Sequence, residues 1–131
     1  MFRCSRPLFN VVKRTTGVTG LKVHPNPLPV LAETYKQTLE VLAGIPSTSV
    51  YKQSAEALTL HKIKVLEAAK GDIAAVENGL DEGQIEESLN IASDELKLAS
   101  QMIEWKAWEP LEEKPERGQW EYLARRLRHD V

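Results

Sequence analysis

The side chains that most often carry catalysis or bind metals are few in this sequence and lie far apart. The chain of 131 residues has one cysteine, Cys4, and three histidines, His24, His61 and His129. No histidine has a second histidine four residues away, the spacing that places two ligands on one helix face. A single thiol cannot hold an iron–sulfur cluster or a cysteine-based zinc site. We therefore expect no metal-binding and no cofactor-binding residues.

The carboxylates are numerous, but their spacing does not favour acid–base catalysis. Glu86-Glu87 and Glu112-Glu113 are adjacent pairs, so on a helix their side chains diverge, whereas catalysis by two carboxylates needs them to converge. A small all-helical enzyme would also need charged residues on the inner helix faces, and Lys62 is essentially the only one. We expect no catalytic residue, and the enzyme hypothesis is a poor alternative.

The net charge of −2 hides a strong asymmetry along the chain. Residues 1–71 carry ten Lys/Arg and four Asp/Glu, whereas residues 72–116 carry three Lys/Arg and thirteen Asp/Glu. The acidic block is either a solvated helix surface or a docking surface for a basic partner. It argues against nucleic acid as a ligand, because phosphate binding needs a concentrated basic face. No apolar run approaches the roughly 18 residues of a membrane span.

The N-terminal 32 residues contain basic and apolar side chains but no acid. This composition is typical of a mitochondrial targeting segment, and we expect it to be retained. The alternative is a basic arm that lies on a partner, and the two interpretations are compatible. Gly17 and Gly20 lack the strand–turn–helix setting of a phosphate-binding loop. Alternating prolines predict that the chain stays extended as far as Pro29.

Three stretches have the periodicity of amphipathic helices and are separated by short connections. Helices are predicted for residues 29–43, 48–70 and 82–108. Asp72 caps a short helical turn that Asn78-Gly79 should break, and Asp81 and Gln84 have the spacing of a capping box. The predicted fold is all-α, a three-helix antiparallel bundle, because short connections favour antiparallel neighbours. The predicted organisation is an N-terminal arm at 1–28, a bundle at 29–109 and an irregular tail at 110–131.

The second predicted helix has an inner stripe that includes Ala55 and Leu58, widened by Leu60 and neighbouring apolar residues. The third carries more apolar residues than two short helices can cover. Its first stripe is Ile85, Leu89, Ala92, Leu96, Ala99 and Ile103, and its second is Ile91, Leu98, Met102 and Trp105.

Two tryptophans near the end of the third predicted helix, Trp105 and Trp108, should lie on one side of it. They are either core residues or anchors for a partner, because tryptophan is enriched at the centres of interfaces. We expect at least one indole to be covered by the N-terminal segment or by another subunit. In the tail, Arg125, Arg126 and Arg128 are expected to contact an acidic partner surface.

Three stretches of the sequence resemble the family of complex I alpha-subcomplex subunit 5, over roughly residues 13 to 120. They are TTGVTGL (15–21) after Lys13-Arg14, Ile45-Pro46 followed by Tyr51, and GQIEESL (83–89) leading to MIEWKAWEPL (102–111). The basic leader and the tail after Trp120 depart from the family pattern, so the resemblance implies nothing about residues 121–131.

The resemblance implies a non-catalytic accessory subunit of the hydrophilic arm of mitochondrial complex I, bound to other subunits of that arm. It would lie on the matrix side of the inner membrane as a peripheral protein, without cofactors, and would not form an independent homo-oligomer. A transient assembly factor is the main alternative. The expected interface residues are Thr15, Thr16, Gly17, Gly20, Leu21, Trp105, Trp108, Pro110, Leu111, Arg125, Arg126 and Arg128.

Overall fold

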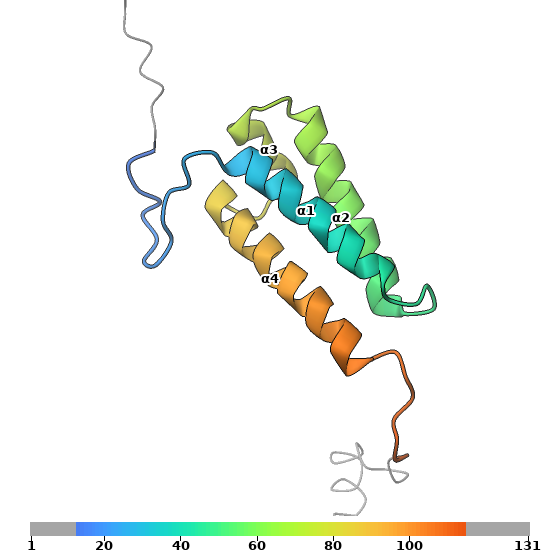
Figure 1. The fold of residues 1–131 in the computed structure, drawn as a ribbon. Coiled ribbons are helices and arrows are strands. Elements are labelled where there is room, and N and C mark those ends of the chain that lie inside the picture. Colours follow the sequence, from blue (N-terminus) through green and yellow to red (C-terminus); the bar gives the residue numbers. More distant parts are fainter. Residues whose placement is uncertain (1–12, 115–131) are drawn as a thin grey trace, which may run out of the picture.

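The computed structural model of the chain describes residues 13–114, and its regular elements are all helices (Figure 1). In chain order they are α1 (Pro27–Ala43), α2 (Val50–Ala68), α3 (Ile73–Leu80) and α4 (Ile85–Trp105). The all-α prediction is confirmed, with four helices rather than three. Figure 1 shows that α1 and α4 run in the same direction and that α2 runs in the opposite one.

Helix α1 is the central element and begins at Pro27, two residues earlier than predicted. Prolines are accepted in a first helical turn because the N–H groups there have no partner within the helix. The buried residues of its interior lie at helical spacing and form one stripe: Leu31, Tyr35, Thr38 and Leu42. Gly44 ends the helix, before Pro46, as predicted.

Helix α2 is covered on fewer sides than its sequence pattern predicts. Ser49 caps its first turn by accepting a hydrogen bond from the backbone N–H of Lys52. Ala55 and Thr59 are buried, but Leu58 is 54% exposed and Leu60 is 43% exposed. The prediction that both leucines belong to the inner face is wrong, because α2 packs mainly on α1 and α3 and has little direct contact with α4.

The prediction that Asn78-Gly79 ends a short helical turn is wrong, because α3 includes both residues. The helix continues to Leu80, and the following Asp81 adopts a left-handed conformation with φ of 54°. A Cβ atom built on Gly79 would lie 2.6 Å from Cγ1 of Val65. The glycine therefore allows close approach of α3 to α2, a use that does not require a helix break.

Helix α4 differs from its prediction at both ends. At its start, the backbone N–H of Gln84 donates to Oε2 of Glu87 at 2.8 Å, so the capping pair is Gln84–Glu87 rather than Asp81–Gln84. At its end, Lys106 has φ of 51° and donates its N–H to the carbonyl of Met102 at 3.0 Å. The helix stops at Trp105, and Trp108 lies beyond it.

The buried residues form two clusters along α1. One contains Leu31, Tyr35, Val76, Ile85 and Ala92. The other contains Leu42, Ile45, Ala55 and Ala99, at the end of the bundle where α1 ends and α2 begins. Both clusters depend on α1, which packs against both α2 and α4.

Candidate functional site

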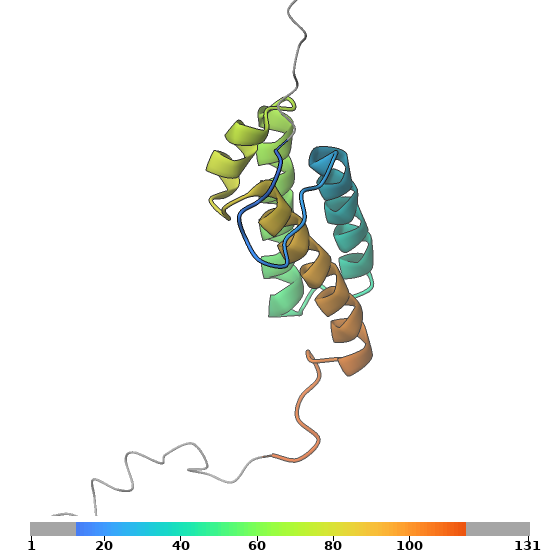
Figure 2. The same cartoon turned by 90° about the vertical axis from the view of Figure 1, so that its left-hand side faces the viewer.

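The segment from Thr15 to Leu21 forms a compact turn against the start of α4 (Figure 2). The hydroxyl of Thr16 donates to the carbonyl of Leu21 at 2.8 Å, and the carbonyl of Thr16 accepts from Nε2 of Gln84 at 2.8 Å. Gly17 and Gly20 have φ of 74° and 86°, a region that favours glycine. Thr16 is buried, so this predicted interface residue is used inside the chain.

Lys13 strengthens this attachment through an ion pair with Glu86 on α4. Nζ of Lys13 lies 2.8 Å from Oε2 of Glu86, and Glu86 is only 3% exposed. Burial alone would raise the pKa of the Glu86 carboxyl. The hydrogen bond from Lys13, together with the backbone N–H groups of Glu86 and His24, outweighs burial and holds that pKa below its ordinary value.

The opposite end of α4 leaves large apolar side chains in solvent. Trp105 is 60% exposed and Leu111 is 73% exposed, with exposed Pro110 between them in sequence. Trp108 is half-buried and packs against the cluster that contains Ile45 and Ala55. The prediction that both indoles lie on one side of a helix is wrong, since Lys106 turns the chain between them.

The two indoles therefore have different surroundings. Trp108 covers one end of the bundle, whereas most of the Trp105 surface is open. The N-terminal segment, which we considered as a cover for an indole, lies at the other end of α4 (Figures 1 and 2). Arg125, Arg126 and Arg128 lie outside the described residues.

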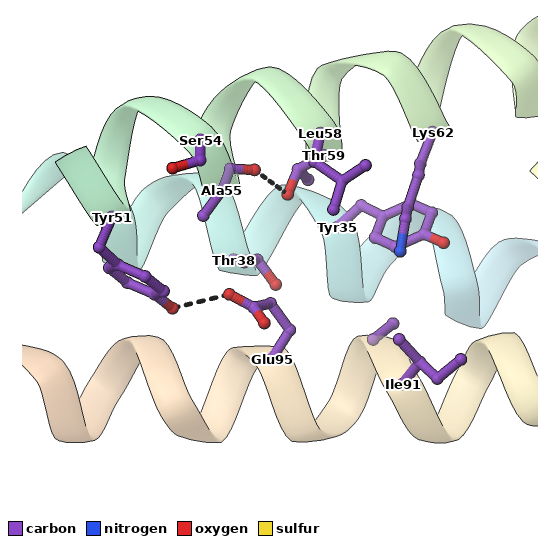
Figure 3. Close-up of a pocket in the computed structure, with 11 residues that line it drawn as sticks. Tyr35, Thr38, Tyr51, Ser54, Ala55, Leu58, Thr59, Lys62, Ile91 and Glu95 are labelled. Atoms are coloured by element: carbon purple, nitrogen blue, oxygen red, sulfur yellow. Dashed lines mark hydrogen bonds between the residues drawn. The ribbon is translucent and has the colours of Figure 1, made fainter. Parts of the chain in front are cut away.

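A groove runs between α2 and α4, with α1 as its floor (Figure 3). It encloses a cavity of about 240 Å³. Its lining residues come from three helices: Tyr35 and Thr38 from α1, Tyr51, Ser54, Ala55, Leu58, Thr59 and Lys62 from α2, and Ile91, Ala92 and Glu95 from α4. The groove exists because α2 and α4 both pack on α1 and hardly on each other.

The charged groups in this groove are paired with groups of the same chain, whereas the buried hydroxyl of Tyr35 has no hydrogen-bond partner among the described residues. The hydroxyl of Tyr51 donates to Oε1 of Glu95 at 2.7 Å, linking α2 to α4 (Figure 3). Burial, then the hydrogen bond and charge of Glu95, raises the pKa of Tyr51 and keeps it protonated. Lys62 pairs with Glu82, and its Nζ lies 5.9 Å from the centre of the Tyr35 ring.

Burial, followed by the negative charge of Glu82, raises the pKa of Tyr35 as well. The sequence showed Lys62 as a charge on an apolar helix face but gave no indication of its partners. The Lys62–Glu82 and Tyr51–Glu95 contacts join separate elements, so helical periodicity alone could not predict them. In the described part of the molecule these contacts hold helices together and do not converge on a reacting centre.

The inventory of chemical groups is short in the part of the chain that the structure describes. Residues 13–114 contain no group of three or more His, Cys, Asp or Glu side chains placed to hold a metal ion. In the same range, none of the helices combines the length and apolar character needed to cross a bilayer. The features that remain are surfaces: the turn at residues 15–21 with a hollow of about 400 Å³ between it and α4, the Trp105–Leu111 end and the groove.

Comparison with known proteins identifies the family. Residues 20–87 match the family described as "ETC complex I subunit conserved region". A protein of Candida albicans named NADH dehydrogenase [ubiquinone] 1 alpha subcomplex subunit MCI4 is 43% identical over 86% of this chain and 81% of its own length. Alpha subcomplex subunit 5 of Bos taurus is 40% identical over 86% of this chain and 96% of its own.

A probable mitochondrial alpha subcomplex subunit 5 of Arabidopsis thaliana is also similar, with 39% identity over 79% of this chain and 60% of its own length. The similarity extends over most of the chain and across fungal, animal and plant relatives. The chain belongs to the family of alpha subcomplex subunit 5, an accessory subunit of the NADH:ubiquinone oxidoreductase complex I.

Proposed function

We propose that this chain is a non-catalytic accessory subunit of the hydrophilic, matrix-facing arm of mitochondrial complex I. It supports the assembly and stability of the electron-transfer arm through protein contacts. It lies peripherally at the inner membrane on the matrix side. Family membership supports the assignment to complex I, and the acid-free, basic start of the sequence favours a mitochondrial destination.

The exposure of Trp105 and Leu111 is the structural observation that best supports a role in binding other subunits. An indole that is 60% exposed and, six residues later, a leucine that is 73% exposed present apolar surface of the kind found at protein interfaces. Exposed Pro110 precedes Leu111, and Trp108 fixes this segment to the bundle. We assign the main contact with neighbouring subunits to this end of α4.

The turn at residues 15–21 is a second contact surface in this proposal. Thr15, Gly17 and Gly20 are exposed and Leu21 is half-buried, while Thr16 holds the turn in shape. The tail residues Arg125, Arg126 and Arg128 are proposed to meet an acidic surface of a neighbouring subunit. The acids of residues 72–114 that are not paired within the described part of the chain are proposed to face a basic surface.

The direct test is native electrophoresis of mitochondrial membranes, followed by quantification of this chain in each band. An accessory subunit comigrates with mature complex I in a fixed ratio to the catalytic subunits. It also remains with the hydrophilic arm when detergent splits the complex. Presence only in smaller intermediates would identify a transient assembly factor and contradict the proposal. Digestion of the chain by protease in intact mitochondria would exclude the matrix location.

A further inference from the structure

We propose that the groove between α2 and α4 is the docking site for one amphipathic helix of a neighbouring complex I subunit. The docked helix presents an apolar stripe to the groove and Lys/Arg residues toward α4. This inference rests on the proposed function and adds to it a specific surface and the chemistry of its occupant.

The shape of the groove suits a helix. Two helices flank it, a third forms its floor, and its walls extend from Tyr51 to Lys62 along α2 (Figure 3). Eleven residues of helix rise about 16 Å, or three turns. A helix laid between α2 and α4 would complete a four-helix arrangement around the stripe of α1, and helix-in-groove binding is a common form of recognition.

The inside of the groove calls for apolar side chains from the partner. Leu58 is 54% exposed and Ile91 is 43% exposed, and both line the groove from opposite walls. The charges inside it, on Lys62 and Glu95, already have partners within the chain. A partner that buried an unpaired charge here would meet no counter-charge, so an apolar stripe is the stable occupant.

The edges of the groove differ in charge, which indicates the orientation of the partner. On α4, Glu87, Ile91 and Asp94 follow at helical spacing, so two acids stand on the same face as Ile91. Glu87 also accepts a hydrogen bond from the backbone N–H of Gln84, and Asp94 pairs with Lys97 at 2.9 Å. Both carboxylates keep their negative charge, and an exposed pair such as Asp94–Lys97 contributes little.

On α2, the wall includes the small residues Ser54 and Ala55 between the larger Tyr51 and Leu58, and these two positions permit close approach of a backbone. A partner helix therefore crosses α2 near Ser54 and Ala55 and places its basic residues beside α4.

The groove also leads toward the proposed contact at Trp105. Ile91, Leu98, Met102 and Trp105 are spaced by seven, four and three residues, so they share one face of α4. This is the second apolar stripe of the sequence. Met102 packs on the cluster that contains Leu42 and Ile45, whereas Ile91 and Trp105 are 43% and 60% exposed. A single partner surface could thus cover the two exposed side chains of the stripe, Ile91 and Trp105.

The chain offers a matched pair of variants for the test. Leu58→Arg places a charge in the groove and repels a basic helix, whereas Leu60→Arg changes a similarly exposed leucine that does not line the groove. Both isolated variants should melt at nearly the wild-type temperature, because both side chains reach solvent. In cells that lack the endogenous chain, Leu58→Arg should lower incorporation into complex I by about tenfold or more, and Leu60→Arg should not.

Equal incorporation of the two variants, with wild-type chain in the complex, would overturn the groove proposal and leave the proposed function intact. Absence of the wild-type chain from complex I would overturn the proposed function itself. A photoreactive residue at position 58 supplies the second measurement in the assembled complex. Crosslinks to one basic, amphipathic segment of another subunit are expected. Crosslinks only to residues 115–131 of this chain, or to no protein, would contradict the proposal.

Discussion

The two ends of α4 differ in how their side chains are used. At the start of the helix, Glu86 pairs with Lys13, and Gln84 donates to the carbonyl of Thr16. At its end, Trp105 and the following Leu111 remain mostly in solvent. The first end is occupied by a segment of the same chain that has no helix of its own, while the second is covered only in part by Trp108.

The start of α4 therefore contributes to the stability of the fold, whereas its end presents exposed side chains to solvent. A segment without regular secondary structure, residues 13–21, belongs to the folded unit because buried polar groups fix it to α4. A well-formed helix end carries the exposed apolar surface that we assign to a partner protein. Changes at the start of α4 should therefore lower the stability of the isolated chain, and changes to the exposed side chains of Trp105 and Leu111 should not.

The largest effect on the isolated chain is expected for Lys13→Met. The variant leaves the buried Glu86 carboxylate without its cation, so the free energy of unfolding should fall by about 3 kcal/mol. This is the lower end of the usual range, because the Lys13 side chain is partly exposed. Urea unfolding measures the change, and Arg14→Met, at an exposed neighbour, is the control. Equal stability of the two variants would show that the Lys13–Glu86 pair contributes nothing to the fold.

The same ion pair predicts a dependence of stability on pH. Because the folded pKa of Glu86 lies below its ordinary value, the carboxylate stabilises the fold above the unfolded pKa of about 4.3. That stability is lost as the pH falls through the lower, folded pKa. The difference in unfolding free energy between wild type and Glu86→Gln should therefore shrink between roughly pH 5 and pH 3. A difference that stays constant over this range would argue against the pair.

A smaller loss is expected for Trp108→Ala at the other end of the molecule. The half-buried indole packs against the cluster of Leu42, Ile45, Ala55 and Ala99. Its removal should cost about 2 kcal/mol, less than the loss of a fully buried tryptophan. Thermal unfolding of the isolated chain measures this, and Trp108→Phe should recover most of the stability. An unchanged melting temperature for Trp108→Ala would mean that the indole does not close the bundle.

The smallest of the core effects is expected for Gly79→Ala. A methyl group at this position would approach Cγ1 of Val65 closely, and the crowding outweighs the higher helix propensity of alanine. The net cost should be about 1 kcal/mol. In a Val65→Ala background the close contact is absent, so adding Gly79→Ala there should cause no further loss of unfolding free energy. If Gly79→Ala alone stabilises the chain, close packing of α3 on α2 is not the reason for the glycine.

The sequence predicted the helices because their buried residues repeat at helical spacing, as Leu31, Tyr35, Thr38 and Leu42 do along α1. It failed where tertiary contacts override local preference. Gly79 is a helix breaker by propensity but a close-packing residue in the structure.

The exposure of the expected interface residues could not be predicted from the sequence. Trp105 and Trp108 are the same residue type, three positions apart, and only the tertiary structure shows that Trp108 packs on the bundle while Trp105 lies in solvent. The bonds of Thr16 and Glu86 connect residues about 70 positions apart. Such contacts have no local signature, and the same is true of the groove between α2 and α4.

The most direct test of the account is a comparison of Trp105→Ala in isolation and in the assembled complex. The isolated variant should unfold at nearly the wild-type temperature, because the Trp105 side chain is mostly in solvent. Its incorporation into complex I should fall with a loss of about 2 kcal/mol of binding, measured by quantifying the chain in the complex I band of a native gel. Wild-type incorporation of Trp105→Ala, or a clear fall in its own melting temperature, would contradict the assignment of this end of α4 to a partner.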